Sequence, residues 1–164
     1  MKNDLPGEWI KLDNAATIYP AVSNKNWNAL FRLSAELREP VDPDMLDRAV
    51  QRTIKRFPAF QMRLRKGVFW YFMERNTRSI SVKPDVANPC VRMKLKENGG
   101  YMFRVRYFNT RIAVEIFHVL TDGAGGLCFL KTLVAEYLTI KYGAVIPREG
   151  DILDCEDPVL DEEM

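Results

Sequence analysis

The alternation of apolar and polar residues predicts the first elements of the chain. Apolar residues occupy every second position from Ala29 to Leu37, which is the period of a strand with one buried face. Apolar residues then recur at helical spacing from Asp42 to Phe57, where Asp42 can act as the N-cap and Pro43 suits the first helical position. Pro58 ends this helical pattern, because proline lacks the backbone N–H that a helix interior needs.

Strand patterns dominate the middle of the chain. Two β-rich stretches surround Lys66-Gly67 in the segment AFQMRLRKGVFWYFME, which predicts a hairpin. The segment SISVKP predicts a short strand. Tyr101–Phe108 and Arg111–His118 predict a strand pair joined at Asn109-Thr110.

The last predicted element is a second helix, which follows a glycine-rich turn. It runs from Leu127 to about Tyr142, and Gly143 suits its C-terminal end. Residues 145–164 are acidic and contain proline, which is typical of a linker or tail. The order of elements predicts one domain over residues 1–144, of α/β or α+β class, with a mixed β-sheet and two main helices.

Composition narrows the possible functions. The 164 residues are enough for one domain with a core, and Lys+Arg 24 against Asp+Glu 22 gives a net charge of +2, which does not indicate a nucleic-acid partner. No apolar run approaches the roughly 20 residues of a membrane span, and the N-terminus has no signal-peptide core. The cysteines are odd in number and widely spaced, which argues against a disulfide framework or structural zinc and predicts a reducing, cytoplasmic location: Cys90, Cys128 and Cys155.

His118 is the only histidine of the chain, and it ends the apolar face of a predicted strand. Ile112, Val114 and Ile116 share that face with it. One interpretation is a structural histidine before an ordinary turn, with Asp122 capping the helix that follows. A free cysteine such as Cys128, in the first turns of an apolar helix, is better explained as a packing residue than as a nucleophile.

A dinucleotide-binding loop is a second interpretation of the same turn. Gly123, Gly125 and Gly126 lie between a predicted strand and a predicted helix, as the Rossmann fingerprint requires. The sixth position of the fingerprint is Cys128, however, and no strand ending in an acidic residue follows about twenty residues later. This pattern is therefore a weak match.

Acyl transfer is a third interpretation, because the string from His118 to Gly123 reads H-x-x-x-D-G. An alcohol or amine that attacks a thioester must lose its proton, and an imidazole with a pKa of about 6.5 suits that task at neutral pH. A strand end holds such a base rigidly. Asp122 could stabilise the turn by pairing with an arginine of another strand, and Gly123 lets the backbone pass close to the histidine or the substrate.

The H-x-x-x-D-G string and its context resemble the CoA-dependent acyltransferase superfamily, which includes chloramphenicol acetyltransferases, alcohol acyltransferases and the condensation domains of nonribosomal peptide synthetases. The segment KRFPAFQMRLRKGVFWYF follows a strand and a helix in the family's order, and WIKLDNAATIYP resembles bacterial alcohol acetyltransferase-like proteins. The resemblance extends from Trp9 to Gly143 and implies a chloramphenicol-acetyltransferase-like fold.

By position, the resemblance implies that His118 is the catalytic base and that Gly123 is the glycine of the motif. It also implies that Asp122 forms a structural salt bridge with Arg63, or with Arg65 as the second choice. Condensation domains usually carry two adjacent histidines, whereas Phe117 precedes the single histidine here. The resemblance therefore favours O-acylation of an alcohol over amide-forming condensation.

The family has two similar halves, and residues 1–144 resemble the N-terminal half only. The resemblance implies an acyl-CoA or acyl-phosphopantetheine co-substrate, an alcohol acceptor, and neither a permanently bound cofactor nor a metal. It further implies that a C-terminal half or self-association completes the channel, and that the chain alone has little activity. The alternatives are a non-catalytic binding module that retains the fold and a condensation-type domain that forms amides or esters.

Overall fold

The computed structural model describes residues 9–10, 29–66 and 71–159, so most of the segment WIKLDNAATIYP lies outside the described residues. The predicted α+β class, with a mixed sheet and two main helices, is confirmed. No helix within the described ranges is long and apolar enough to cross a membrane. The elements in chain order are β1 (Trp9–Ile10), β2 (Leu30–Glu36), α2 (Pro43–Thr53), the 3₁₀ turns η1 (Ile54–Arg56) and η2 (Pro58–Gln61), β3 (Met62–Lys66), β4 (Tyr71–Arg75), β5 (Lys83–Pro84), β6 (Phe103–Phe108), β7 (Arg111–Phe117) and α3 (Gly123–Tyr142).

The strands form two sheets. The larger has the order β2-β7-β6-β5 and is mixed, because β5 runs parallel to β6 while the other pairs are antiparallel. The smaller has the order β1-β4-β3 and contains the hairpin predicted around Lys66-Gly67. An isolated bridge between Arg63 and Tyr101 joins this hairpin to the segment that leads into β6.

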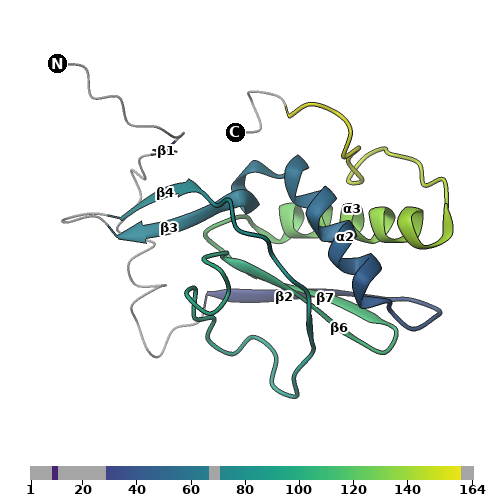
Figure 1. Ribbon diagram of the computed structural model, residues 1–164, viewed down its shortest axis with the longest axis horizontal. Coiled ribbons are helices and arrows are strands. Elements are labelled where there is room, and N and C mark those ends of the chain that lie inside the picture. The colour runs from purple at the N-terminus through teal and green to yellow at the C-terminus, as the bar shows by residue number, and fades with distance from the viewer. Residues whose placement is uncertain (1–8, 11–28, 67–70, 160–164) are drawn as a thin grey trace.

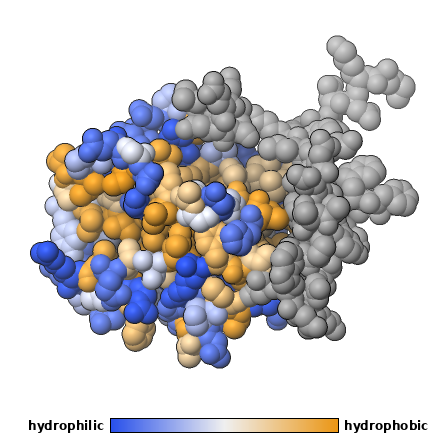
Figure 2. Space-filling model, turned by 180° about the vertical axis from the view of Figure 1, so that it is seen from behind, coloured by the Kyte–Doolittle hydropathy of each residue, from blue (hydrophilic) through white to orange (hydrophobic). Residues whose placement is uncertain are grey.

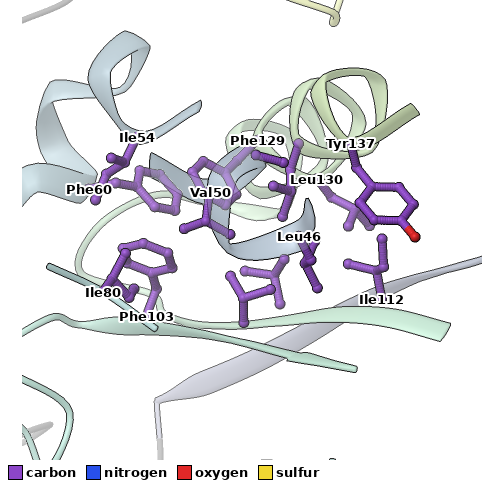
Figure 3. Packing of buried hydrophobic residues seen from close by; sticks show 14 of the residues in the cluster. Leu46, Val50, Ile54, Phe60, Ile80, Phe103, Ile112, Phe129, Leu130 and Tyr137 are labelled. Carbon is purple, nitrogen blue, oxygen red and sulfur yellow. The ribbon is translucent and has the colours of Figure 1, made fainter. Parts of the chain in front are cut away.

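Helices α2 and α3 lie together on one face of the larger sheet, and the β3–β4 hairpin projects beyond its end (Figure 1). The apolar face of β7 packs against both helices, as the strand period predicts. Figure 3 shows these side chains meeting between the helices and the sheet. The fully buried members of this core include Leu46, Val50, Phe103, Ile112, Ile116, Phe129, Leu133 and Tyr137.

A second apolar cluster lies between the hairpin and the other side of the sheet. It consists of Met62, Met73, Met93, Met102 and Phe117. Methionine is unbranched and fills irregular gaps, which suits a junction between two sheets. Seen from behind Figure 1, hydrophobic residues also show in the middle of the molecule, with hydrophilic residues among and around them (Figure 2).

The ends of the two helices show which local predictions hold. Helix α2 begins at Pro43 with Asp42 as its N-cap, as predicted, but it ends at Thr53 rather than at Phe57. The chain continues in 3₁₀ turns, because the residue before Pro58 is pushed out of the helical region. Helix α3 ends at Gly143, whose φ of 64° is the left-handed cap that was predicted.

Residues 145–164 are predicted to be a linker or tail, and the described part of this segment lies against the helices. Arg148 Nη2 is 2.6 Å from a carboxylate oxygen of Glu136 on α3. The backbone N–H of Leu153 donates to Thr132 Oγ1 at 3.0 Å. The described part of this tail therefore packs on the domain, while the last residues, 160–164, lie outside the described ranges.

Candidate functional site

His118 lies in the turn directly after β7, and its side chain is exposed. Its backbone N–H donates to the carbonyl oxygen of Ala29 at 2.9 Å. This bond ties the start of the turn to the residue just before β2. The imidazole ring lies against the ring of Phe31, with centroids 4.4 Å apart and planes tilted by 38°. Among the described residues no hydrogen bond to either ring nitrogen is found, and the residue is exposed.

Phe31 links His118 to helix α3. It lies opposite Ile116 in the register of β2 and β7. A Cβ atom on Gly126 would lie 2.8 Å from the Phe31 ring and 3.1 Å from Ile116 Cδ1. Glycine at position 126 therefore lets the first turn of α3 approach the ring that supports the histidine.

Replacing Gly126 by alanine is expected to destabilise the fold, although alanine is the better helix former. Overpacking costs about 1–3 kcal/mol, which exceeds the gain of up to about 1 kcal/mol in helix propensity. Gly123→Ala is the matched control, because a Cβ there meets nothing within 4 Å. Urea denaturation of both variants measures the difference. Equal midpoints would show that the Phe31 ring can move to accept the added Cβ without loss of stability.

Asp122 does not form the predicted salt bridge with Arg63. Both Nη2 and Nε of Arg63 contact Glu74 Oε1, at 2.6 and 2.7 Å. Arg65, the second candidate, places its Nε 3.0 Å from the same oxygen. The reason is register, since Arg63 and Glu74 are direct cross-strand partners in the hairpin.

Asp122 instead caps helix α3, which is the alternative that its position before the helix allows. Its Oδ1 accepts from the backbone N–H of Gly125 at 2.9 Å. The helix begins at Gly123, so the predicted glycine-rich turn is the first turn of α3. Thr121 closes over this turn, because its Oγ1 would lie 2.0 Å from a Cβ atom at Gly125.

Because Asp122 is a cap, Asp122→Ala is expected to cost about 1 kcal/mol of unfolding free energy. A broken buried ion pair would cost about 3–5 kcal/mol. Asp122→Asn is the control, since asparagine caps about as well as aspartate. Chemical denaturation distinguishes the two accounts, and a loss in the larger range would refute the capping role.

Two of the three glycines in this region are required by close neighbours, and one is not. Gly125 and Gly126 have close neighbours, whereas Gly123 faces open space, so no contact among the described residues requires the glycine of the motif. No strand follows α3 in the described part of the chain, which removes the βαβ unit that a dinucleotide loop needs.

Cys128 is half-buried, and burial raises the pKa of its thiol, which disfavours a nucleophilic thiolate.

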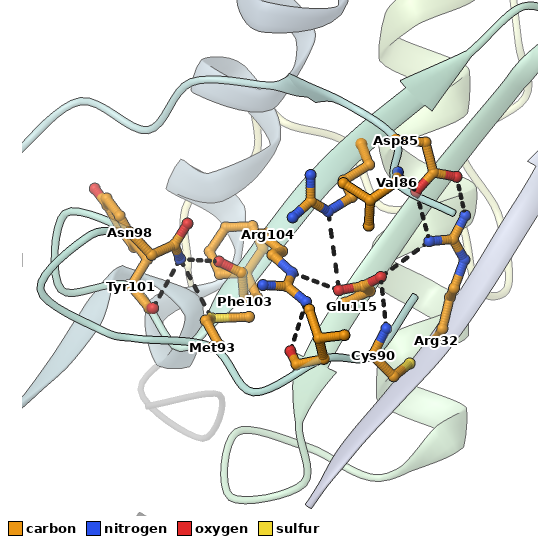
Figure 4. A network of polar contacts seen from close by, with 12 residues as sticks. Arg32, Asp85, Val86, Cys90, Met93, Asn98, Tyr101, Phe103, Arg104 and Glu115 are labelled. Carbon is orange, nitrogen blue, oxygen red and sulfur yellow. Dashed lines mark hydrogen bonds and ion pairs between the residues drawn. The ribbon is translucent and has the colours of Figure 1, made fainter. Parts of the chain in front are cut away.

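A buried ionic network around Glu115 was not predicted from the sequence (Figure 4). The Glu115 side chain is fully buried, and its Oε1 is 2.9 Å from Arg32 Nη1. Its other oxygen accepts from Arg104 Nε, and the backbone N–H of Cys90 donates to Oε1 at 3.1 Å. Arg32 also pairs with Asp85, which joins the segment after β5 to the sheet.

The charges of this network set the ionisation of its members. Burial by itself would raise the pKa of Glu115, but hydrogen bonds from the Cys90 N–H and from Arg104 outweigh burial and lower it. Side chains alternate along β7, so Glu115 faces away from the side occupied by Ile116. The network therefore supports the sheet from the face opposite the helices. The only sign of it in the sequence is a single acidic residue inside an apolar strand.

The described residues contain no group of three or more His, Cys, Asp or Glu side chains that could hold a metal ion. The structure places the site residues predicted from the sequence in two separate regions. His118, Asp122 and Gly123 lie together at the junction of β7 and α3, whereas Arg63 belongs to the β3–β4 hairpin and pairs there with Glu74. The structural neighbour of the histidine that sequence reasoning missed is Phe31.

Comparisons with known proteins show similarity in structure. No model of a known protein family matches the chain, and no curated protein matches its sequence. The starter condensation domain of rhizomide synthetase RzmA has a TM-score of 0.64 at 12% identity, over 84% of this chain and 38% of that chain. Polyketide synthase associated protein 5 from Mycobacterium tuberculosis has a TM-score of 0.58 at 16% identity, over 85% of this chain and 35% of that chain.

A further matching structure is a mutant of the RzmA starter condensation domain in complex with C8-CoA. Its TM-score is 0.56 at 12% identity, over 71% of this chain and 31% of that chain. The chain thus spans about a third of the length of these neighbours. The described part of the protein has the fold of a portion of a condensation domain.

Proposed function

We propose that this protein takes part in acyl transfer from a thioester to an alcohol, with His118 as the general base. The observation that carries the proposal is the exposed histidine at the junction of β7 and α3, whose ring is held against Phe31. A condensation domain with the same partial fold has been crystallised with C8-CoA, which supports a thioester as the donor.

The chemistry needs one base and no covalent enzyme intermediate. A ring nitrogen of His118 takes the hydroxyl proton as the alcohol oxygen attacks the thioester carbonyl carbon. The tetrahedral intermediate collapses, the carbon–sulfur bond breaks, and His118 returns the proton to the departing thiolate. The rigid support of the imidazole serves this cycle, because a base that must both accept and donate has to keep its position.

The proposed donor is acyl-CoA or an acyl-phosphopantetheine group. Since the chain spans about a third of the length of its structural neighbours, we extend the proposal to a channel completed by a second half or by another copy of the chain.

An alcohol acceptor is proposed in preference to an amine because of Phe117. The position before His118 is taken up by a ring that is 6% exposed and packs into the methionine cluster. The site therefore has one imidazole, where condensation domains usually have two adjacent histidines. This difference supports ester formation over amide formation.

The test is thiol release from acyl-CoA, followed in parallel with a set of alcohols and a set of amines. The proposal expects release that rises with an alcohol and depends on His118. Release stimulated only by amines would transfer the assignment to amide-forming condensation. Thioester binding without any release, once the channel is completed, would assign the protein to the non-catalytic binding modules.

A further inference from the structure

A cleft of about 200 Å³ lies between η2, the first turns of α3 and the C-terminal segment. The lining is mostly apolar and includes Phe57, Phe60, Leu120 and Leu153, while Arg56 and Thr121 add polar groups to it. The volume is below the roughly 300–1,000 Å³ of sites that enclose a whole drug-sized ligand. The cleft therefore has room for one apolar arm of a larger ligand rather than for a nucleotide.

The aromatic part of the lining is held in place by the buried ring of Phe129, which lies behind it. The rings of Phe60 and Phe129 are parallel within 2°, with centroids 4.2 Å apart. Phe57 meets Phe129 edge-on at 5.1 Å. A surface that is already ordered binds an apolar group without first losing side-chain freedom.

The cleft adjoins the turn that carries His118. Leu120 and Thr121 line it, and both belong to the segment between β7 and α3. The backbone N–H of Leu120 donates to the carbonyl oxygen of Phe117 at 2.9 Å, which closes this turn. A chain lying in the cleft would therefore have one end beside the segment that holds the imidazole.

The outer wall comes from the C-terminal segment, and polar contacts outside the cleft hold it in place. Glu136 is 2% exposed and joins Arg52 of α2, at 3.0 Å, to Arg148 of the segment. The Leu153 backbone N–H is fixed by Thr132, and Leu153 is a lining residue of the cleft. These polar contacts hold the outer wall without using the apolar surface of the cleft.

From this geometry we propose that the cleft binds the apolar acyl chain of the thioester and that Leu153 limits the length of chain it accepts. The inference rests on the acyl transfer proposed above for His118. Three features specify the occupant: the aromatic and aliphatic lining, the space for a single unbranched chain, and the position beside the turn that carries His118.

Calorimetric titration with octanoyl-pantetheine, butanoyl-pantetheine and pantetheine tests the inference. Each buried methylene group adds about fourfold in affinity, so burial of two of the four extra methylenes should make the octanoyl ligand bind at least about tenfold more tightly than the butanoyl ligand. Leu153→Trp should remove this advantage and leave pantetheine binding unchanged. Equal affinity of the protein for all three ligands would overturn the inference.

Val145→Trp is the matched control, because Val145 lies on the same segment, is 95% exposed and does not line the cleft. It should bind all three ligands like the wild type. Leu153→Ala provides a second variant in case the tryptophan prevents folding, and it should shift the preference toward dodecanoyl-pantetheine. An unchanged length preference in Leu153→Ala would count against the proposed wall.

Binding and turnover separate this inference from the proposed function. Binding that depends on chain length and on Leu153, without thiol release, would retain the cleft and reject the reaction. Thiol release that depends on His118 but shows no effect of chain length or of Leu153 would retain the reaction and reject the cleft.

Discussion

Once the proposed channel is completed, His118→Ala is expected to lower turnover by about 10²–10⁴-fold, because general-base assistance is lost. No other histidine exists in the chain to take over the proton. The side chain is exposed and contacts the ring of Phe31, so its removal should change the melting temperature little. Thiol release in the presence of an alcohol measures the effect.

Gly123→Ala provides a control for this variant, since it alters the same motif at a position with open space around it. It should leave folding intact and separate a general disturbance of the turn from the loss of the imidazole. Near-normal thiol release by His118→Ala would remove the histidine from the mechanism. The exposed imidazole would then be a surface feature of the β7–α3 junction.

Glu115→Ala should have the largest effect on stability, a loss of about 3–5 kcal/mol in unfolding free energy. The change would leave Arg32 and Arg104 without their shared buried carboxylate. It would also leave the backbone N–H of Cys90 without its acceptor. Urea denaturation followed by circular dichroism gives the loss directly.

Glu97→Ala is the matched control, because Glu97 pairs with Lys94 while both side chains are 70% exposed. Exposed pairs contribute about 0–1 kcal/mol, so this variant should be close to the wild type. Comparable losses in the two variants would mean that the buried network contributes no more than a surface pair.

The same network predicts a dependence on pH. The pKa of Glu115 in the folded protein lies below its ordinary value of 4.5. Its stabilising contribution is therefore complete above that value and is lost as the pH falls through the lower, folded pKa. The wild type should lose stability more steeply below pH 4.5 than Glu115→Gln, whose side chain does not titrate.

Local sequence determined most of the elements of this protein. The alternating positions of 29–37 form β2, and Asp42 with Pro43 begins α2. Gly143 ends α3 in the left-handed conformation, which glycine adopts without steric cost. These features depend on dihedral preferences and on hydrogen bonds between neighbouring residues, so they can be predicted without knowledge of the fold.

The candidate site could be predicted only in part, because some of its contacts depend on how distant strands pair. The position of His118 after an apolar strand and the capping position of Asp122 follow from the order of residues along the chain. The ring of Phe31 beside the imidazole does not, because it depends on the register in which β2 pairs with β7. A shift of one residue in that register would place another side chain there.

Tertiary structure decided how the charged residues pair. Arg63 takes Glu74 rather than Asp122, because the hairpin register places them opposite each other. Glu115 gathers its arginines from two neighbouring strands, and Glu136 anchors the C-terminal segment through Arg148. A sequence with many acidic residues and arginines allows many possible ion pairs. Only the packing of distant segments brings a particular pair within contact distance.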